Sequence, residues 1–149
     1  MANPVSQSES RLVGVRLGTQ DRDMASHIPG TIVVIDDDPL VRHAIARLLR
    51  SIYCTVETFD SVEAFLRSPR GEAPACLVLD VDVPGLSDHE LQQTLTAAPQ
   101  PIPILFLTRG GPRRRAATAL PGGAVAWLTK PFAAHELFNT LRQVITRPR

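Results

Sequence analysis

Carboxylate side chains gather where an apolar run ends near the start of the sequence. Residues 31–38 read TIVVIDDD, so Asp36, Asp37 and Asp38 directly follow four apolar residues. Like charges this close repel one another, and burial penalises each of them further. Mg²⁺ would make the cluster tolerable, because it prefers oxygen ligands and is commonly held by one or two carboxylates. The alternative is that these residues only cap a solvated helix.

Three further polar side chains follow apolar runs later in the chain. Asp80 ends ACLVLD, Thr108 ends IPILFLT, and Lys130 comes shortly after AVAWL. Lys130 is the only lysine among sixteen basic residues, which is consistent with a need for a compact ammonium charge. With a cation, an ammonium and a hydroxyl around it, Asp80 is suited to accept a phosphoryl group as an acyl phosphate. Each residue alone has an ordinary structural explanation, so the prediction rests on the combination.

Short apolar runs alternate with amphipathic segments from residue 31 onward. We predict five strands, at residues 31–35, 54–59, 75–80, 102–108 and 124–128. Helices are predicted after each strand, at residues 39–51, 61–67, 87–97, 112–120 and 133–145. Asp38 followed by Pro39 is typical of a helix N-cap and first turn, and Ser61 and Ser87 precede two other helices.

This strict alternation, with strands that are apolar throughout, favours an α/β fold. We predict a doubly wound, five-stranded parallel sheet with helices on both faces. In such a sheet polar sites gather beyond the carboxyl ends of the strands. The polar residues that end the apolar runs are therefore expected to share one edge.

The composition is that of one neutral globular domain. The chain has 149 residues, of which 44% are hydrophobic and 21% charged, and its formal net charge is +1. These values argue against disorder and against a polyanion-binding surface. No apolar run approaches the roughly 20 residues that span a bilayer, and no secretory signal is recognisable, so we expect a cytoplasmic protein without a membrane partner. Cys54 and Cys76 lie in apolar stretches and are expected to pack in the core.

Residues 1–30 differ from the rest in composition. They are rich in Ser, Gln, Asp and Arg, with scattered glycines. We expect a flexible N-terminal extension there, followed by the folded domain at residues 31–147.

The motifs together resemble the receiver domain of bacterial two-component response regulators. The resemblance rests on VIDDDPLVR, LVLDVDVPGLSDHEL, ILFLT and LTKPF. The stretches VETFDSVEAFL and CLVLDVDVPG are similar to receivers of the nitrogen-fixation and nodulation regulator group. The resemblance implies a flavodoxin-like (β/α)5 fold with strand order 2-1-3-4-5 and a Mg²⁺ cofactor.

The family's metal and acceptor residues can be carried over by position. Asp80 matches the phosphoacceptor, Asp37 the direct Mg²⁺ ligand and Asp36 its water-mediated partner. Asp82, two residues after the acceptor, would offer its backbone carbonyl to the metal.

Three further positions match residues that respond to phosphorylation. Thr108 and Lys130 match the pair that contacts the phosphoryl group. Trp127 falls on an aromatic switch position coupled to Thr108, and the alternative is a core aromatic of the fifth strand. The peptide bond between Lys130 and Pro131 is expected to be cis, as is usual in the family.

The resemblance also implies partners. A histidine kinase or phosphotransfer protein would phosphorylate the chain, which would dephosphorylate itself slowly. A downstream protein would bind the face formed by the predicted fourth helix, fifth strand and fifth helix, or phosphorylation would drive homodimer formation. Such receivers usually precede a DNA-binding domain. Because the sequence ends at Arg149, we expect a stand-alone receiver, or the receiver part of a regulator whose DNA-binding domain is absent from this chain.

Two basic features depart from the family pattern. Arg109 stands where the family prefers a small residue, so its bulk could obstruct access to Asp80 or its charge could contact phosphate. We expect the acyl phosphate to decay slowly as a result. The run Arg113 to Arg115 is typical of a solvated or partner-docking face rather than of a nucleic-acid site.

Two other functions compete with a phosphorylation switch. LDVDVPG is similar to the nucleophile motif of haloacid-dehalogenase-like phosphatases, but in that family the motif comes first and the acidic pair last, whereas here the pair precedes Asp80. The second alternative is a binding module with a receiver fold that works without phosphorylation.

Overall fold

The sheet and its helices are built from short elements that alternate along most of the chain that the structure describes. A computed structural model describes residues 30–69, 71–86, 89–110 and 125–146. The strands are β1 (Thr31–Ile35), β2 (Thr55–Phe59), β3 (Cys76–Asp80), β4 (Ile104–Thr108) and β5 (Val125–Thr129). The helices are α3 (Pro39–Ser51), α4 (Val62–Arg67), α5 (His89–Ala97) and α7 (Ala134–Thr146). Residues 1–29 of the expected N-terminal extension and the helix expected at residues 112–120 lie outside the described residues.

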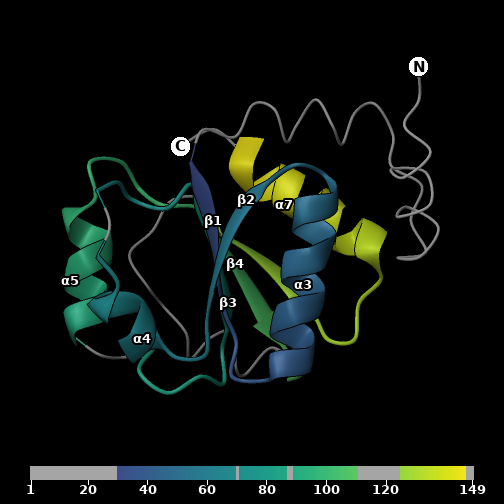
Figure 1. The fold of residues 1–149 in the computed structure, drawn as a ribbon, viewed down its shortest axis with the longest axis horizontal. Helices are drawn as coiled ribbons and strands as arrows, with labels where there is room; N and C mark the ends of the chain where they lie inside the picture. The colour runs from purple at the N-terminus through teal and green to yellow at the C-terminus, as the bar shows by residue number, and fades with distance from the viewer. Residues whose placement is uncertain (1–29, 70, 87–88, 111–124, 147–149) are drawn as a thin grey trace.

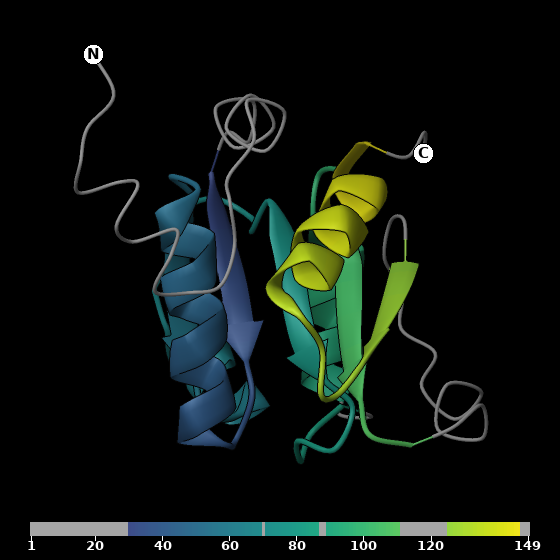
Figure 2. The same ribbon diagram turned by 90° about the vertical axis from the view of Figure 1, so that its right-hand side faces the viewer.

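All five strands run parallel, in the order β2-β1-β3-β4-β5. Figure 2 shows the arrows of β1, β3 and β5 pointing the same way, and the carboxyl ends of parallel strands lie at one edge. The chain passes from β1 outward to β2 and then back across β1 to β3. In open α/β sheets, ligands bind at the carboxyl edge beside such a reversal, which here falls between β1 and β3. The predicted fold and strand order are confirmed.

Helices cover both faces of the sheet. Figure 1 shows α3 and α7 on one side and α4 and α5 on the other. Successive residues of β1 alternate between the two layers: Ile32 and Val34 pack with the α3 and α7 residues, and Val33 and Ile35 with those of α4 and α5. Since a central strand has a helix layer on either face, every position in it must be apolar. This explains the continuous apolar runs.

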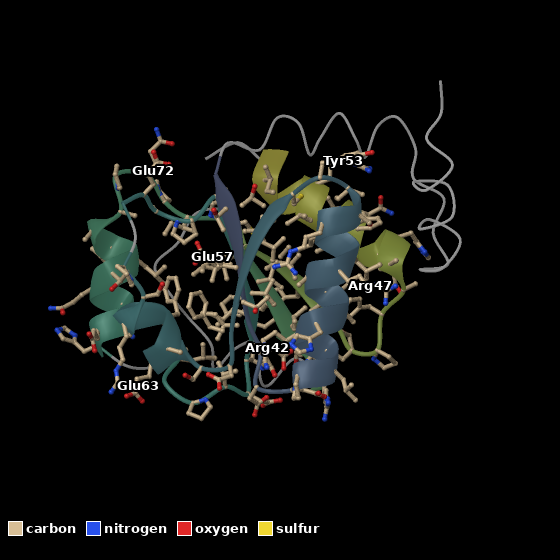
Figure 3. All side chains as sticks on the ribbon, in the orientation of Figure 1. Arg42, Arg47, Tyr53, Glu57, Glu63 and Glu72 are labelled. Carbon is tan, nitrogen blue, oxygen red and sulfur yellow. The ribbon has the colours of Figure 1, made fainter. Side chains whose placement is uncertain are left out.

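The edge strands differ from that expectation. Residues of β1, β3 and β4 are buried almost throughout, as predicted, whereas most residues of β2 and β5 are exposed or partly buried. Glu57 of β2, labelled in Figure 3, is exposed while Val56 beside it is buried. An edge strand has a neighbouring strand on one side only, so it is less covered than a central strand and several of its side chains reach water.

Local signals explain where the elements begin. Asp38 caps α3, because its Oδ1 accepts a hydrogen bond from the Leu40 amide at 2.9 Å. Ser61 Oγ likewise accepts from the Ala64 amide at 3.0 Å at the start of α4. Both N-caps were predicted, whereas Ser87 lies outside the described residues. Strand β4 begins two residues later than predicted, and Pro103 just before it has no amide hydrogen for the ladder.

Both cysteines are free and buried, as predicted, with Cys54 7% exposed and Cys76 0%. Burial raises the pKa of Cys54 from 9.0 to about 11, which lowers its thiolate fraction roughly a hundredfold. Burial raises the pKa of Cys76 to about 12. We therefore expect neither thiol to react with Ellman's reagent in the folded chain at mildly alkaline pH, and both to react at once in denaturant. Fast labelling under native conditions would contradict this burial.

Candidate functional site

Three carboxylates meet at the carboxyl edge of the sheet. Asp36 follows β1 and Asp80 ends β3, and these two strands are neighbours. Oxygen atoms of Asp36, Asp37 and Asp80 all lie within 4.8 Å of one another. Asp36 and Asp80 are buried, with 0% and 4% exposed, while Asp37 is exposed. The structure therefore brings together the acidic residues that the sequence singled out.

Lys130 reaches this cluster from beyond β5. Its Nζ lies 2.7 Å from Asp36 Oδ2 and 3.2 Å from Asp80 Oδ2, and its side chain is 8% exposed. Its backbone amide donates to the Thr108 carbonyl at 2.8 Å, which ties the residue to the end of β4. The bond between Lys130 and Pro131 is cis, as predicted. A single ammonium thus bridges two buried carboxylates at the ends of the interior strands β1 and β3.

Backbone amides hold the other oxygen of each buried carboxylate. Asp36 Oδ1 accepts from the Asp38 amide at 2.9 Å, and Asp80 Oδ1 accepts from the Asp82 amide at 3.0 Å. The two side chains are arranged alike, with one oxygen bound to the backbone and the other to Lys130. Both carboxylates are therefore held in fixed orientations before any ligand binds.

Negative charge exceeds positive charge in this cluster, where three carboxylates surround one ammonium. Burial, the largest cause, raises the pKa of Asp36 above its ordinary value of 3.8, and the charge of Asp80 adds to this effect. Hydrogen bonds from Lys130 and from the Asp38 amide oppose it. A set of closely spaced oxygens with excess negative charge fits a hard divalent cation such as Mg²⁺.

The remaining predicted residues lie on β4, on β5 and in the loop after β3. Thr108 is fully buried at the end of β4, and its hydroxyl exchanges hydrogen bonds with Gly110: it accepts from the amide at 2.9 Å and donates to the carbonyl at 3.2 Å. Trp127 is half-buried in β5 and stacks on Phe106, with ring centroids 4.6 Å apart. Asp82 is exposed and contributes its amide to Asp80.

Two contacts were not found from the sequence. Arg42 of α3, labelled in Figure 3, donates from its guanidinium to the Asp36 backbone carbonyl at 2.8 Å. Asp38 forms an ion pair with Arg109 at 3.6 Å in addition to capping α3. The position of Arg42, one helical turn after the cap, could have indicated the first contact. The second joins residues that are distant in sequence and left no local signal.

The chain is similar to known proteins over most of its length. Residues 32–142, from β1 into α7, match the response regulator receiver domain family. The transcriptional regulatory protein FixJ of Bradyrhizobium diazoefficiens is 39% identical over 116 residues, 78% of this chain and 57% of that protein. Nodulation protein W of the same organism is 36% identical over 118 residues, 79% of this chain and 52% of that protein.

A solved structure is also similar. The response regulator receiver protein from Burkholderia phymatum has a TM-score of 0.61 and 33% identity, covering 78% of this chain and 95% of that protein. The chain spans about half the length of the curated relatives it matches. Among the described residues no helix is long and apolar enough to cross a membrane. The matched family, the sheet order and the nitrogen-fixation and nodulation relatives agree with the sequence motifs, and the chain belongs to the response regulator receiver domains of two-component systems.

Proposed function

We propose that the chain is a switch that accepts a phosphoryl group on Asp80 from a histidine kinase or phosphotransfer protein. One observation carries the proposal. Asp80 lies 3.2 Å from the Lys130 ammonium and within 4.8 Å of the oxygens of Asp36 and Asp37. An isolated structural carboxylate would need neither a buried ammonium nor two further carboxylates beside it.

Phosphoryl transfer would use Asp80 as the nucleophile. A carboxylate oxygen forms a bond to phosphorus while the bond between phosphorus and the donor's imidazole nitrogen breaks, and the imidazole leaves with the electron pair. Lys130 is placed to balance the negative charge of the new acyl phosphate. The amide of Asp82 fixes the direction of the carboxylate during the attack.

Asp36, Asp37 and Asp80 would hold Mg²⁺, together with the backbone carbonyl of Asp82. The ion would supply positive charge to the phosphoryl oxygens, which a single lysine cannot neutralise. Of the three carboxylates Asp37 is the exposed one, so its side chain is accessible to the water from which an ion would arrive. Asp36 is buried and already bonded to Lys130, which suits the water-mediated role that the family pattern gives it.

Thr108 and Trp127 would transmit the change. A phosphoryl oxygen on Asp80 is a charged acceptor and competes well with the neutral Gly110 carbonyl for the Thr108 hydroxyl. Trp127 lies in β5, the strand that pairs with β4, and would move when Thr108 moves. The downstream partner, or a second copy of the chain, would bind the face of β5, α7 and residues 112–120. The switch would work in the cytoplasm, within a domain at residues 31–147.

Acetyl phosphate with Mg²⁺ tests the proposal. We expect one phosphoryl group per chain, located on Asp80 by peptide mass spectrometry. Beryllofluoride with Mg²⁺ should change the fluorescence of Trp127, the only tryptophan, and chelation of the metal should reverse the change. Label on another residue would contradict Asp80 as the acceptor. A folded chain that takes no label would favour a binding module that works without phosphorylation.

A further inference from the structure

An ion pair crosses the edge of the sheet where Asp80 lies. Arg109 directly follows β4, while Asp38 follows β1 and caps α3. Because β3 lies between β1 and β4, a contact between these two side chains spans the end of β3. The Arg109 Nη2 is 3.6 Å from Asp38 Oδ2. This bridge therefore lies across the strand end that carries Asp80.

Asp80 is almost closed to solvent, although the phosphoryl group must be added and removed there. Its side chain is only 5% exposed. Arg109 and Lys130 both line a groove of about 480 Å³ beside α3, and the Lys130 ammonium reaches from there to Asp80. Lys130 is fixed between two carboxylates, whereas the Arg109 side chain is 65% exposed and makes a long ion pair. Of the two cations, Arg109 is the one that can move aside.

If Asp80 is phosphorylated as proposed above, we propose further that the pair of Arg109 and Asp38 is a gate that limits the access of water to the acyl phosphate. In hydrolysis, a water oxygen bonds to phosphorus as the bond between phosphorus and the Asp80 oxygen breaks. The carboxylate leaves with the electron pair, and both water protons leave with the released dihydrogen phosphate. Arg109 acts here by its position over the path of water, and it lengthens the lifetime of the phosphorylated state.

The strength of the ion pair limits how large this effect can be. Exposed ion pairs are weak, so the closed position is favoured by at most roughly fivefold over the open one. Salt screens exposed pairs, since the Debye length falls from about 10 Å at 0.1 M to about 3 Å at 1 M. Raising the salt concentration should therefore open the gate and shorten the lifetime of the acyl phosphate.

The decay of the acyl phosphate on the full chain tests the gate, at saturating Mg²⁺ for each variant. We expect Arg109→Ala to shorten the half-life roughly two- to fivefold. Asp38→Asn should shorten it equally, because asparagine keeps the helix cap but removes the charge. The double variant should decay no faster than either single one. Arg109→Lys should shorten the half-life less than Arg109→Ala does. Arg47→Ala, at an exposed position of α3, should leave the half-life unchanged.

Salt separates the gate from a structural role of Arg109. High salt should speed the decay in the unaltered chain and leave it unchanged in Arg109→Ala. An unchanged half-life in Arg109→Ala would overturn the gate, and so would a longer one, which would show that the guanidinium assists the transition state. Equal half-lives with normal labelling contradict only the gate. The absence of label on Asp80 in all chains contradicts the proposed function itself.

Discussion

Replacing Asp80 by asparagine should abolish phosphorylation while leaving the fold intact. An amide oxygen is a poor nucleophile, and loss of a nucleophile typically lowers a rate by at least about three orders of magnitude. The asparagine Oδ1 can still accept the hydrogen bond that the Asp82 amide gives Asp80 at 3.0 Å. Lys130 keeps its shorter contact, at 2.7 Å, with Asp36. We therefore expect the stability to change by no more than about 1 kcal/mol.

Acetyl phosphate labelling followed by mass spectrometry measures this loss, and urea unfolding checks the fold. Asp60→Asn is the matched control, because Asp60 also follows a strand of the sheet but is exposed and lies outside the carboxylate cluster. It should be labelled like the unaltered chain. Label that persists in Asp80→Asn would place the acceptor elsewhere, and the two neighbouring carboxylates, Asp36 and Asp37, would then have to be tested in turn.

The gathering of these residues could be predicted because it follows from topology. Once Asp36 and Asp80 are assigned to the ends of parallel strands, they must lie at the same edge, whatever their side chains do. The apolar runs of β1, β3 and β4 made that assignment secure, since a central strand is buried on both faces. The order of the strands came instead from the family resemblance, as alternation alone does not fix which strand lies beside which.

The pairing of atoms within the site could not be predicted. Long side chains such as Lys130 and Arg109 have many rotamers, and the one adopted depends on charges from distant parts of the chain. The sequence therefore did not indicate that Lys130 lies closer to Asp36 than to Asp80, or that Arg109 pairs with Asp38. The hydrogen bonds of Thr108 with Gly110 depend on the backbone of the following loop, which no periodicity encodes.

Removing the ammonium of Lys130 should destabilise the fold, and more strongly at neutral than at acidic pH. Methionine has a similar length without the charge, so Lys130→Met leaves Asp36, which is 0% exposed, without its partner at 2.7 Å. Breaking a buried ion pair by removing one member typically costs about 3 kcal/mol. We expect a loss of this order in the free energy of unfolding at about pH 7.5, measured with urea.

The pH dependence follows from the protonation of Asp36. Burial already raises the pKa of Asp36 above 3.8, and the hydrogen bond from Lys130 is a cause that lowers it, so the variant should have a still higher pKa. A group with a raised pKa favours the folded state when it is protonated, and this contribution disappears as the pH rises through the raised pKa. The difference in the free energy of unfolding between the variant and the unaltered chain should therefore be smaller at about pH 4.5 than at about pH 7.5.

A double variant distinguishes charge from packing in this prediction. Adding Asp36→Asn to Lys130→Met removes the unpaired charge, while the amide oxygen can still accept the hydrogen bond from the Asp38 amide. It should recover much of the stability lost in Lys130→Met, and its own stability should no longer depend on protonation of residue 36. Lys130→Met would contradict the electrostatic account if its loss were the same at both pH values. That result would assign the loss to the packing contacts of the lysine alkyl chain, which methionine would then replace poorly.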